Sequence, residues 1–149
     1  SYRSSIIGGQ RNIIEKSDGS VISGGEYNKI TGGTNYGGVF GGRSNVVNGS
    51  VSESSVIVAG ESNTATDARF GAIVGGTLNT MDNNFRSVII GGLNNTNNSD
   101  QGAIIAGDDN TIDTTSNKSA IIAGEENDIT SSSSFLNDCT RSSVMPLRS

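Results

Sequence analysis

One short phrase occurs eight times in this chain of 149 residues. A mostly apolar run leads into two small residues, the second always glycine, and an asparagine follows three places later, as in SVIIGGLN from Ser87. The eight glycines, 15 to 18 residues apart, are Gly9, Gly25, Gly42, Gly60, Gly76, Gly92, Gly107 and Gly124. This spacing is too short for the repeats of helical arrays and suits one coil of a β-solenoid.

Each phrase has fixed apolar positions on both sides of its glycine. A β-branched aliphatic residue always stands three places before it, and an apolar residue stands five places after it in seven copies, with Asn97 as the exception. Gly-Gly or Ala-Gly interrupts every aliphatic run, which argues against helices, and the regular Ile and Val residues argue against disorder. The pattern predicts an all-β protein, a parallel β-solenoid of about eight coils. Each coil has a strand, a glycine corner, a second short strand and a polar return loop.

The asparagine of the phrase is invariant among the eight copies. Its members are Asn12, Asn28, Asn45, Asn63, Asn79, Asn95, Asn110 and Asn127. Stacked coils place equivalent side chains about 4.8 Å apart, so these amides can hydrogen-bond along the stack as a ladder and to the corner backbone. We therefore predict a structural role for them rather than a catalytic one.

Composition and charge exclude several functional classes. The net charge of −5 argues against binding to nucleic-acid phosphates, and no apolar stretch is long enough for membrane insertion. The chain contains no histidine and a single cysteine, Cys139, so neither an intrachain disulfide nor a nucleophile activated by histidine can form. We expect a protein that is not an enzyme.

The aliphatic runs have two apolar faces, because neighbouring residues of a strand point to opposite sides. The core or trimer-face candidates are Ile57, Val58, Ile73, Val74, Ile89, Ile90, Ile104, Ile105, Ile121 and Ile122. A thin solenoid has one interior, so one column would form an exposed stripe of roughly 38 Å, at about 4.8 Å per coil. This predicts a parallel homotrimer, intertwined or side by side. The alternative is a wide coil that covers both columns within one chain.

The phrases SVIIGGLNNT, GAIIAGDDNTI and SAIIAGEENDI resemble two groups of proteins. They are similar to the head repeats of YadA-like trimeric autotransporter adhesins, and more so to the Ile-Gly-Gly-x-x-Asn-x-Ile arrays in tail fibres and spikes of phages and large viruses. The resemblance covers about residues 5–130. It implies left-handed β-rolls associated in threes, and host-surface attachment through a glycan or protein receptor from a virion or cell surface. Repeats longer than the adhesin unit, and asparagine in place of its serine, favour the fibre or spike.

The period is lost after residue 130. We therefore expect a repeat domain over 1–130 and a C-terminal cap or tail over 131–149. Its apolar residues Phe135, Leu136, Val144, Met145 and Leu147 can cover the last coil, which would otherwise present an unpaired strand edge.

Loop residues with large side chains are the candidates for receptor contact. They are Tyr27, Tyr36, Phe70, Phe85 and Arg86. Variable loops on a rigid scaffold carry recognition, and aromatic side chains supply contact area. Phe70 and Phe85 are expected at equivalent places before consecutive strands, where they can instead pack beneath the loops.

Acidic residues recur at the glycine corner. Glu26, Glu61, Asp108 and Glu125 share one repeat position, and Asp109 and Glu126 stand beside the last two. Stacked carboxylates repel one another, so one hypothesis is a Ca²⁺ ion held by Asp108, Asp109, Glu125 and Glu126. The other is a solvated acidic corner. Paired carboxylates also leave open a polysaccharide-depolymerase spike.

A threonine follows the asparagine in four successive copies, at Thr64, Thr80, Thr96 and Thr111. A flat threonine row on a solenoid also suits an ice-binding protein, which is the second alternative function. Lys29, Val46 and Asp128 occupy the same position elsewhere and interrupt the row.

Overall fold

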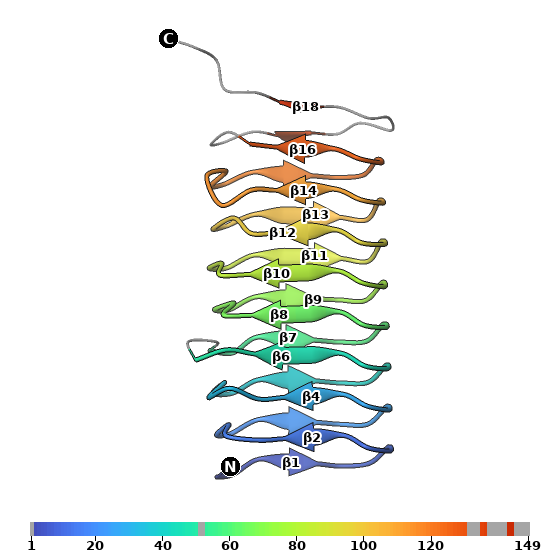
Figure 1. Ribbon diagram of the computed structural model, residues 1–149, viewed down its shortest axis with the longest axis vertical. Helices are drawn as coiled ribbons and strands as arrows, with labels where there is room; N and C mark the ends of the chain where they lie inside the picture. The colour runs from blue at the N-terminus through green and yellow to red at the C-terminus, as the bar shows by residue number, and fades with distance from the viewer. Residues whose placement is uncertain (1, 51–52, 131–134, 137–142, 145–149) are drawn as a thin grey trace.

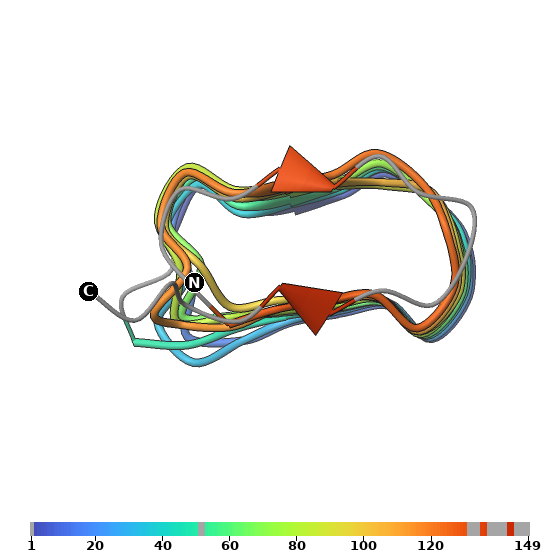
Figure 2. The same ribbon diagram turned by 90° about the horizontal axis from the view of Figure 1, so that it is seen from above.

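The protein is a stack of flattened coils. The computed structural model describes residues 2–50, 53–130, 135–136 and 143–144, and these residues form short β-strands and no helix. The strands belong to two nine-stranded parallel sheets, one built from the odd-numbered and one from the even-numbered strands. Figure 1 shows the coils rising from the N-terminal end, and Figure 2 shows the two sheets facing each other across a narrow interior. The predicted all-β parallel solenoid is confirmed.

The odd sheet contains the strands that precede the glycine corners. They are β1 (Ser5–Ile6), β3 (Val21–Ile22), β5 (Gly38–Val39), β7 (Val56–Ile57), β9 (Ala72–Ile73), β11 (Val88–Ile90), β13 (Ala103–Ile105), β15 (Ala120–Ile121) and β17 (Phe135–Leu136). Neighbouring strands pair in register, so that Ile89 lies beside Ile73 and Ile104.

The even sheet contains the strands that follow the glycine corners. They are β2 (Ile13–Ile14), β4 (Lys29–Ile30), β6 (Val46–Asn48), β8 (Thr64–Thr66), β10 (Thr80–Asp82), β12 (Thr96–Asn97), β14 (Thr111–Ile112), β16 (Asp128–Ile129) and β18 (Ser143–Val144). Changes in repeat length are absorbed in the loops that return from this sheet to the next odd strand. In Figure 2 these loops spread apart at the left, whereas the glycine corners at the right superimpose closely.

The core is a double column of side chains between the sheets. Its fully buried members are Ile22, Val39, Ile57, Ile73, Ile89, Ile104 and Ile121 from the odd sheet and Ile30, Val47, Ala65, Met81, Ile112 and Ile129 from the even sheet. These residues occupy the two fixed apolar positions of the repeat, three before and five after the glycine. The hydrophobic periodicity therefore determines the interior of the solenoid.

Asn97 interrupts the core column of the even sheet without leaving its amide unpaired. It is fully buried between Met81 and Ile112 in the register of the strands. Its Oδ1 accepts a hydrogen bond from Ser99 Oγ at 2.9 Å, and its Nδ2 donates to the Val88 carbonyl at 3.3 Å. A buried amide is tolerated when its polar atoms have partners.

The two small residues at each corner have different steric requirements. Gly92 has a φ of +85°, and a Cβ there would lie 2.4 Å from both Asn95 Nδ2 and the Gly107 carbonyl oxygen. Gly91 also has a positive φ, +73°, but a Cβ there would meet nothing within 4 Å. The equivalent position of the next coil holds Ala106 at φ 68°.

These geometries predict opposite tolerance of alanine at adjacent positions. Gly92→Ala should lower the free energy of unfolding by about 2 to 5 kcal/mol, from left-handed strain and a clash with the next coil. Gly91→Ala should lower it by only about 1 to 2 kcal/mol, from strain alone. Urea unfolding followed by circular dichroism measures both, and equal losses would contradict the close approach at Gly92.

Two further strands pair with the stack beyond residue 130, in the segment expected to be a C-terminal cap or tail. β17 pairs with β15 and aligns Leu136 with Ile121, while β18 pairs with β16 and aligns Val144 with Ile129. Leu136 and Val144 keep the spacing of the core residues in the preceding coil, although the glycine and asparagine are lost. The predicted cap residues Met145 and Leu147, and the cysteine Cys139, lie outside the described residues.

Candidate functional site

The asparagines form a continuous ladder at the glycine corners. Asn79 Nδ2 donates to the carbonyls of Gly75 at 3.2 Å and Gly92 at 3.1 Å. Its Oδ1 accepts from the backbone N–H of Asn95 at 3.0 Å and from Asn95 Nδ2 at 3.1 Å. From Asn28 to Asn127 these side chains are at most 1% exposed, and Asn12, in the first coil, is half-buried. The ladder holds the corner together and is inaccessible to a ligand.

The outward face of the odd sheet is an exposed apolar face. In β11, Ile89 is fully buried whereas Ile90 is 41% exposed. The equivalent outward residues, which we call the outer column, are Ile7, Phe40, Val58, Val74, Ile90, Ile105 and the half-buried Ile122, with Ser23 as its polar member. Val56, Ala72, Val88, Ala103 and Ala120 add a second, half-buried apolar row to this face.

The position of the outer column decides between the two ways of covering the aliphatic residues. The inner members of the predicted set, Ile57, Ile73, Ile89, Ile104 and Ile121, all lie in the core. Their partners Val58, Val74, Ile90 and Ile105 are 37 to 44% exposed. The wide coil that hides both columns within one chain is therefore wrong, because the interior has room for one residue from each strand.

The outward face of the even sheet is polar instead. Thr64, Thr80, Thr96 and Thr111 lie beside one another in the strand register. Val46 precedes this row and Asp128 follows it. The solenoid thus has one apolar and one polar outer face.

The acidic residues of the glycine corner do not converge. Within the described part of the chain, no three Asp, Glu, His or Cys side chains lie close enough to hold a metal ion, so the four carboxylates proposed for Ca²⁺ form no such site. Asp108 lies between Leu93 and Glu125 in the bridge register, and Asp109 and Glu126 lie in a separate column with left-handed backbones. Asp109 accepts a hydrogen bond from Asn94 Nδ2 instead.

A basic residue interrupts the same acidic column nearer the N-terminus. Arg43 lies between Glu26 and Glu61 in the bridge register and forms an ion pair with Glu61. The hydrogen bond that Arg43 donates to Glu61, together with the negative charge of that carboxylate, raises the pKa of the exposed Arg43 guanidinium. The contact is open to water, where ion pairs contribute little to stability.

Two of the predicted receptor-contact residues lie on opposite edges. Tyr27 is at a glycine corner, 46% exposed, and its hydroxyl accepts a hydrogen bond from Arg11, whose guanidinium lies 5.1 Å from the ring centroid. Tyr36 is in a return loop, is 63% exposed, and packs against Gly19 of the preceding coil. The structure therefore does not bring these two tyrosines into one site.

The other three candidates form a cluster in the return loops. The Phe70 and Phe85 rings meet edge to face at 5.7 Å, and the Arg86 guanidinium lies 4.4 Å from the Phe85 centroid. The sequence suggested that the two phenylalanines occupy equivalent positions, but the structure shows that they do not. Phe85 pairs with Arg69, so Phe70 corresponds to Arg86, because Phe70 stands three residues before the next core residue and Phe85 stands four before its own.

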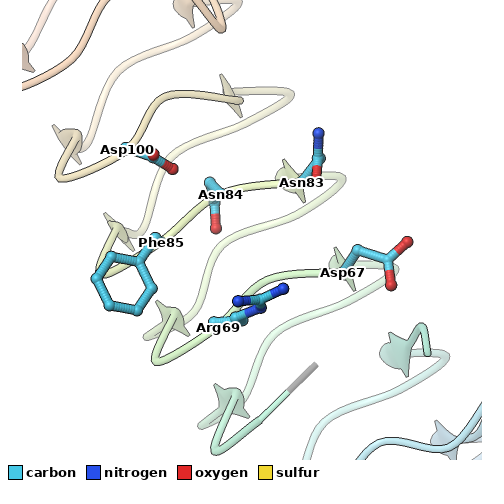
Figure 3. A pocket seen from close by; sticks show the side chains of 6 residues that line it. All are labelled: Asp67, Arg69, Asn83, Asn84, Phe85 and Asp100. Carbon is cyan, nitrogen blue, oxygen red and sulfur yellow. The ribbon is translucent and has the colours of Figure 1, made fainter. Parts of the chain in front are cut away.

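A hollow adjoins this cluster on the return-loop edge. It has a volume of about 440 Å³ and is lined by Asp67, Arg69, Asn83, Asn84, Phe85 and Asp100 (Figure 3). Of these residues, sequence reasoning selected only Phe85. The sequence does mark one of the missed residues, Asn84, as unusual. The equivalent positions of other coils hold the smaller Ser17, Thr34, Ala68, Ser99 and Ser116.

None of the described residues belongs to a helix long and apolar enough to cross a membrane. In comparisons with known proteins, no family model matches the chain, and no curated protein sequence matches it.

Proposed function

We propose that this protein is the shaft or attachment segment of a trimeric surface fibre. Three solenoids would lie parallel and side by side, with the apolar faces of their odd sheets together. The fibre belongs on a virion, as part of a tail fibre or spike, or on a cell surface. It acts by contact with a host-surface glycan or protein, without catalysis.

The outer column is the observation that supports this assembly. Burying one aliphatic side chain contributes about 1.5 to 3 kcal/mol, so covering six or more per chain offsets a large association penalty. Monomers rarely leave a continuous apolar stripe of this kind exposed. Because the coils repeat at one spacing, a second copy in parallel orientation presents a column of matching pitch.

Parallel register predicts that the same residue of different chains meets at the interface. In a Cys139→Ser background, oxidation of Ile105→Cys should give disulfide-linked dimers on a non-reducing gel, because the Cβ atoms can approach to about 3.5 to 4.5 Å. Thr111→Cys, in the same coil but on the polar face, is the matched control and should remain uncrosslinked. Equal crosslinking at both positions, or none at Ile105→Cys, would contradict the parallel assembly.

The threonine row supports one competing function, ice binding, because Thr64, Thr80, Thr96 and Thr111 are aligned in register. The row is only four residues long and ends at Val46 and Asp128, which is why we favour the fibre. Thermal hysteresis of the purified protein separates the two. The fibre predicts none, and a clear freezing-point gap that Thr80→Lys abolishes would favour ice binding.

A further inference from the structure

We propose that the hollow on the return-loop edge binds a neutral saccharide. It is built by three successive return loops, which follow β8, β10 and β12, so the fold itself sets its dimensions (Figure 3). Its volume falls within the range of small-molecule sites, about 300 to 1,000 Å³. The inference rests on the attachment role proposed above and deepens it by naming the chemical class of the receptor.

The floor of the hollow carries an unused hydrogen-bond acceptor. Asn84 is 3% exposed, and its Nδ2 is held by the Asn97 carbonyl at 2.7 Å. Its Oδ1 has no hydrogen-bond partner and points along the edge toward the coil of Arg69 (Figure 3). Buried polar atoms rarely remain unpaired, so a hydroxyl donor at the floor would satisfy this oxygen once a small rotation of the Asn84 side chain turns it to the hollow.

The walls carry both donors and acceptors. Arg69 shares the return loop after β8 with Asp67, and Asp100 lies two loops further along the stack, yet Arg69 forms no ion pair with another described residue. The Arg69 guanidinium therefore keeps its donors for a ligand. Sugar hydroxyls both donate and accept, so they can bind carboxylate, guanidinium and amide groups together, and bonds to the charged groups are the stronger ones.

An aromatic ring completes the site. Phe85 lines the hollow, and its ring is fixed by edge-to-face contact with Phe70 and by Arg86. A fixed ring offers apolar contact to the C–H face of a sugar at little entropic penalty. The hollow is open to solvent on the return-loop edge, so one copy should bind weakly, and three copies in one fibre would strengthen attachment through multivalency.

The charge of the site favours a neutral ligand. Two carboxylates and one guanidinium give the lining a formal charge of −1, and the whole chain carries −5. An acidic sugar would meet repulsion from Asp67 and Asp100. We therefore expect neutral glycosides to bind in preference to uronic acids.

The test is an NMR titration of the isotope-labelled assembled protein. Methyl glucoside, methyl galactoside and methyl N-acetylglucosaminide serve as neutral probes, and methyl glucuronide as the acidic one. At least one neutral probe should shift the signals of the lining residues, and the glucuronide should bind more weakly. Arg69→Asn should weaken binding about tenfold or more. Asparagine is chosen because Asn35 occupies the equivalent position of another coil.

Asp100→Asn provides a second variant should Arg69→Asn fail to fold, and it should also weaken binding. Arg43→Gln, on the opposite edge, is the control and should leave binding unchanged. The proposal is overturned if no neutral probe shifts the lining residues, if the glucuronide binds more tightly, or if neither lining variant weakens binding. Sedimentation of the same samples reports assembly separately, so a monomer that still binds the probe refutes the trimeric fibre but supports the saccharide site.

Discussion

Ile89→Asp should prevent folding, whereas Ile90→Asp should leave the solenoid folded and separate the chains. Ile89 is fully buried between Ile73 and Ile104, so the substitution removes about 1.5 to 3 kcal/mol of apolar burial. It also places an unpaired carboxylate in the core, at about 3 to 5 kcal/mol more. Their sum is comparable with the whole stability of a domain, about 5 to 15 kcal/mol.

Ile90 differs because it is 41% exposed on the outward face. A carboxylate there stays hydrated in a single chain, but it would be buried with its copies at the threefold contact. Circular dichroism should show a folded Ile90→Asp protein, and its mass should fall to the 15.3 kDa of one chain. Thr96→Asp, on the polar face, is the control and should keep the assembled mass. A trimeric Ile90→Asp protein would exclude the outer column from the interface.

The second large effect is expected at the asparagine ladder. Asn79→Leu keeps the side-chain volume roughly constant but removes the acceptor of the Asn95 N–H and the donor to the Gly75 carbonyl. Each buried polar group left unpaired costs about 1 to 3 kcal/mol, so the free energy of unfolding should fall by about 2 to 6 kcal/mol. Urea unfolding at matched protein concentration measures the loss.

Asn94→Ser is the matched control for the ladder. Asn94 is the exposed residue immediately before Asn95, and the equivalent positions of two other coils hold Ser44 and Ser62 with the same left-handed backbone. Its substitution should change stability by about 0.5 kcal/mol or less. A similar loss for both variants would show that the ladder contributes no more than an ordinary surface amide.

The sequence predicted the solenoid because its chemistry repeats. The residues three before and five after each glycine form the core, and Asn97, the exception in the pattern, is the polar residue of that core. Glycine and asparagine mark the corner because a Cβ at Gly92 would clash with the Asn95 amide and the next coil. After residue 130 the phrase is lost, and β17 and β18 keep only the apolar spacing as they pair with the last strands of the repeat.

The interaction surfaces were less predictable. Alternation along β11 indicated that Ile89 and Ile90 face opposite ways, but only the structure shows which of them faces outward. The hollow depends on side chains from three successive return loops, and no single repeat position reveals that Arg69, Asn84 and Asp100 line one space. Adjacent acidic residues suggested a cation site, but neighbouring residues at the corner belong to separate columns along the stack, and their carboxylates do not converge.

The mass of the purified protein in dilute solution tests the central claim most directly. Multi-angle light scattering should give about 46 kDa, three times the 15.3 kDa of one chain. A folded protein that remains at 15.3 kDa as its concentration is raised would contradict the account, because the outer column would then be stable in water without a partner.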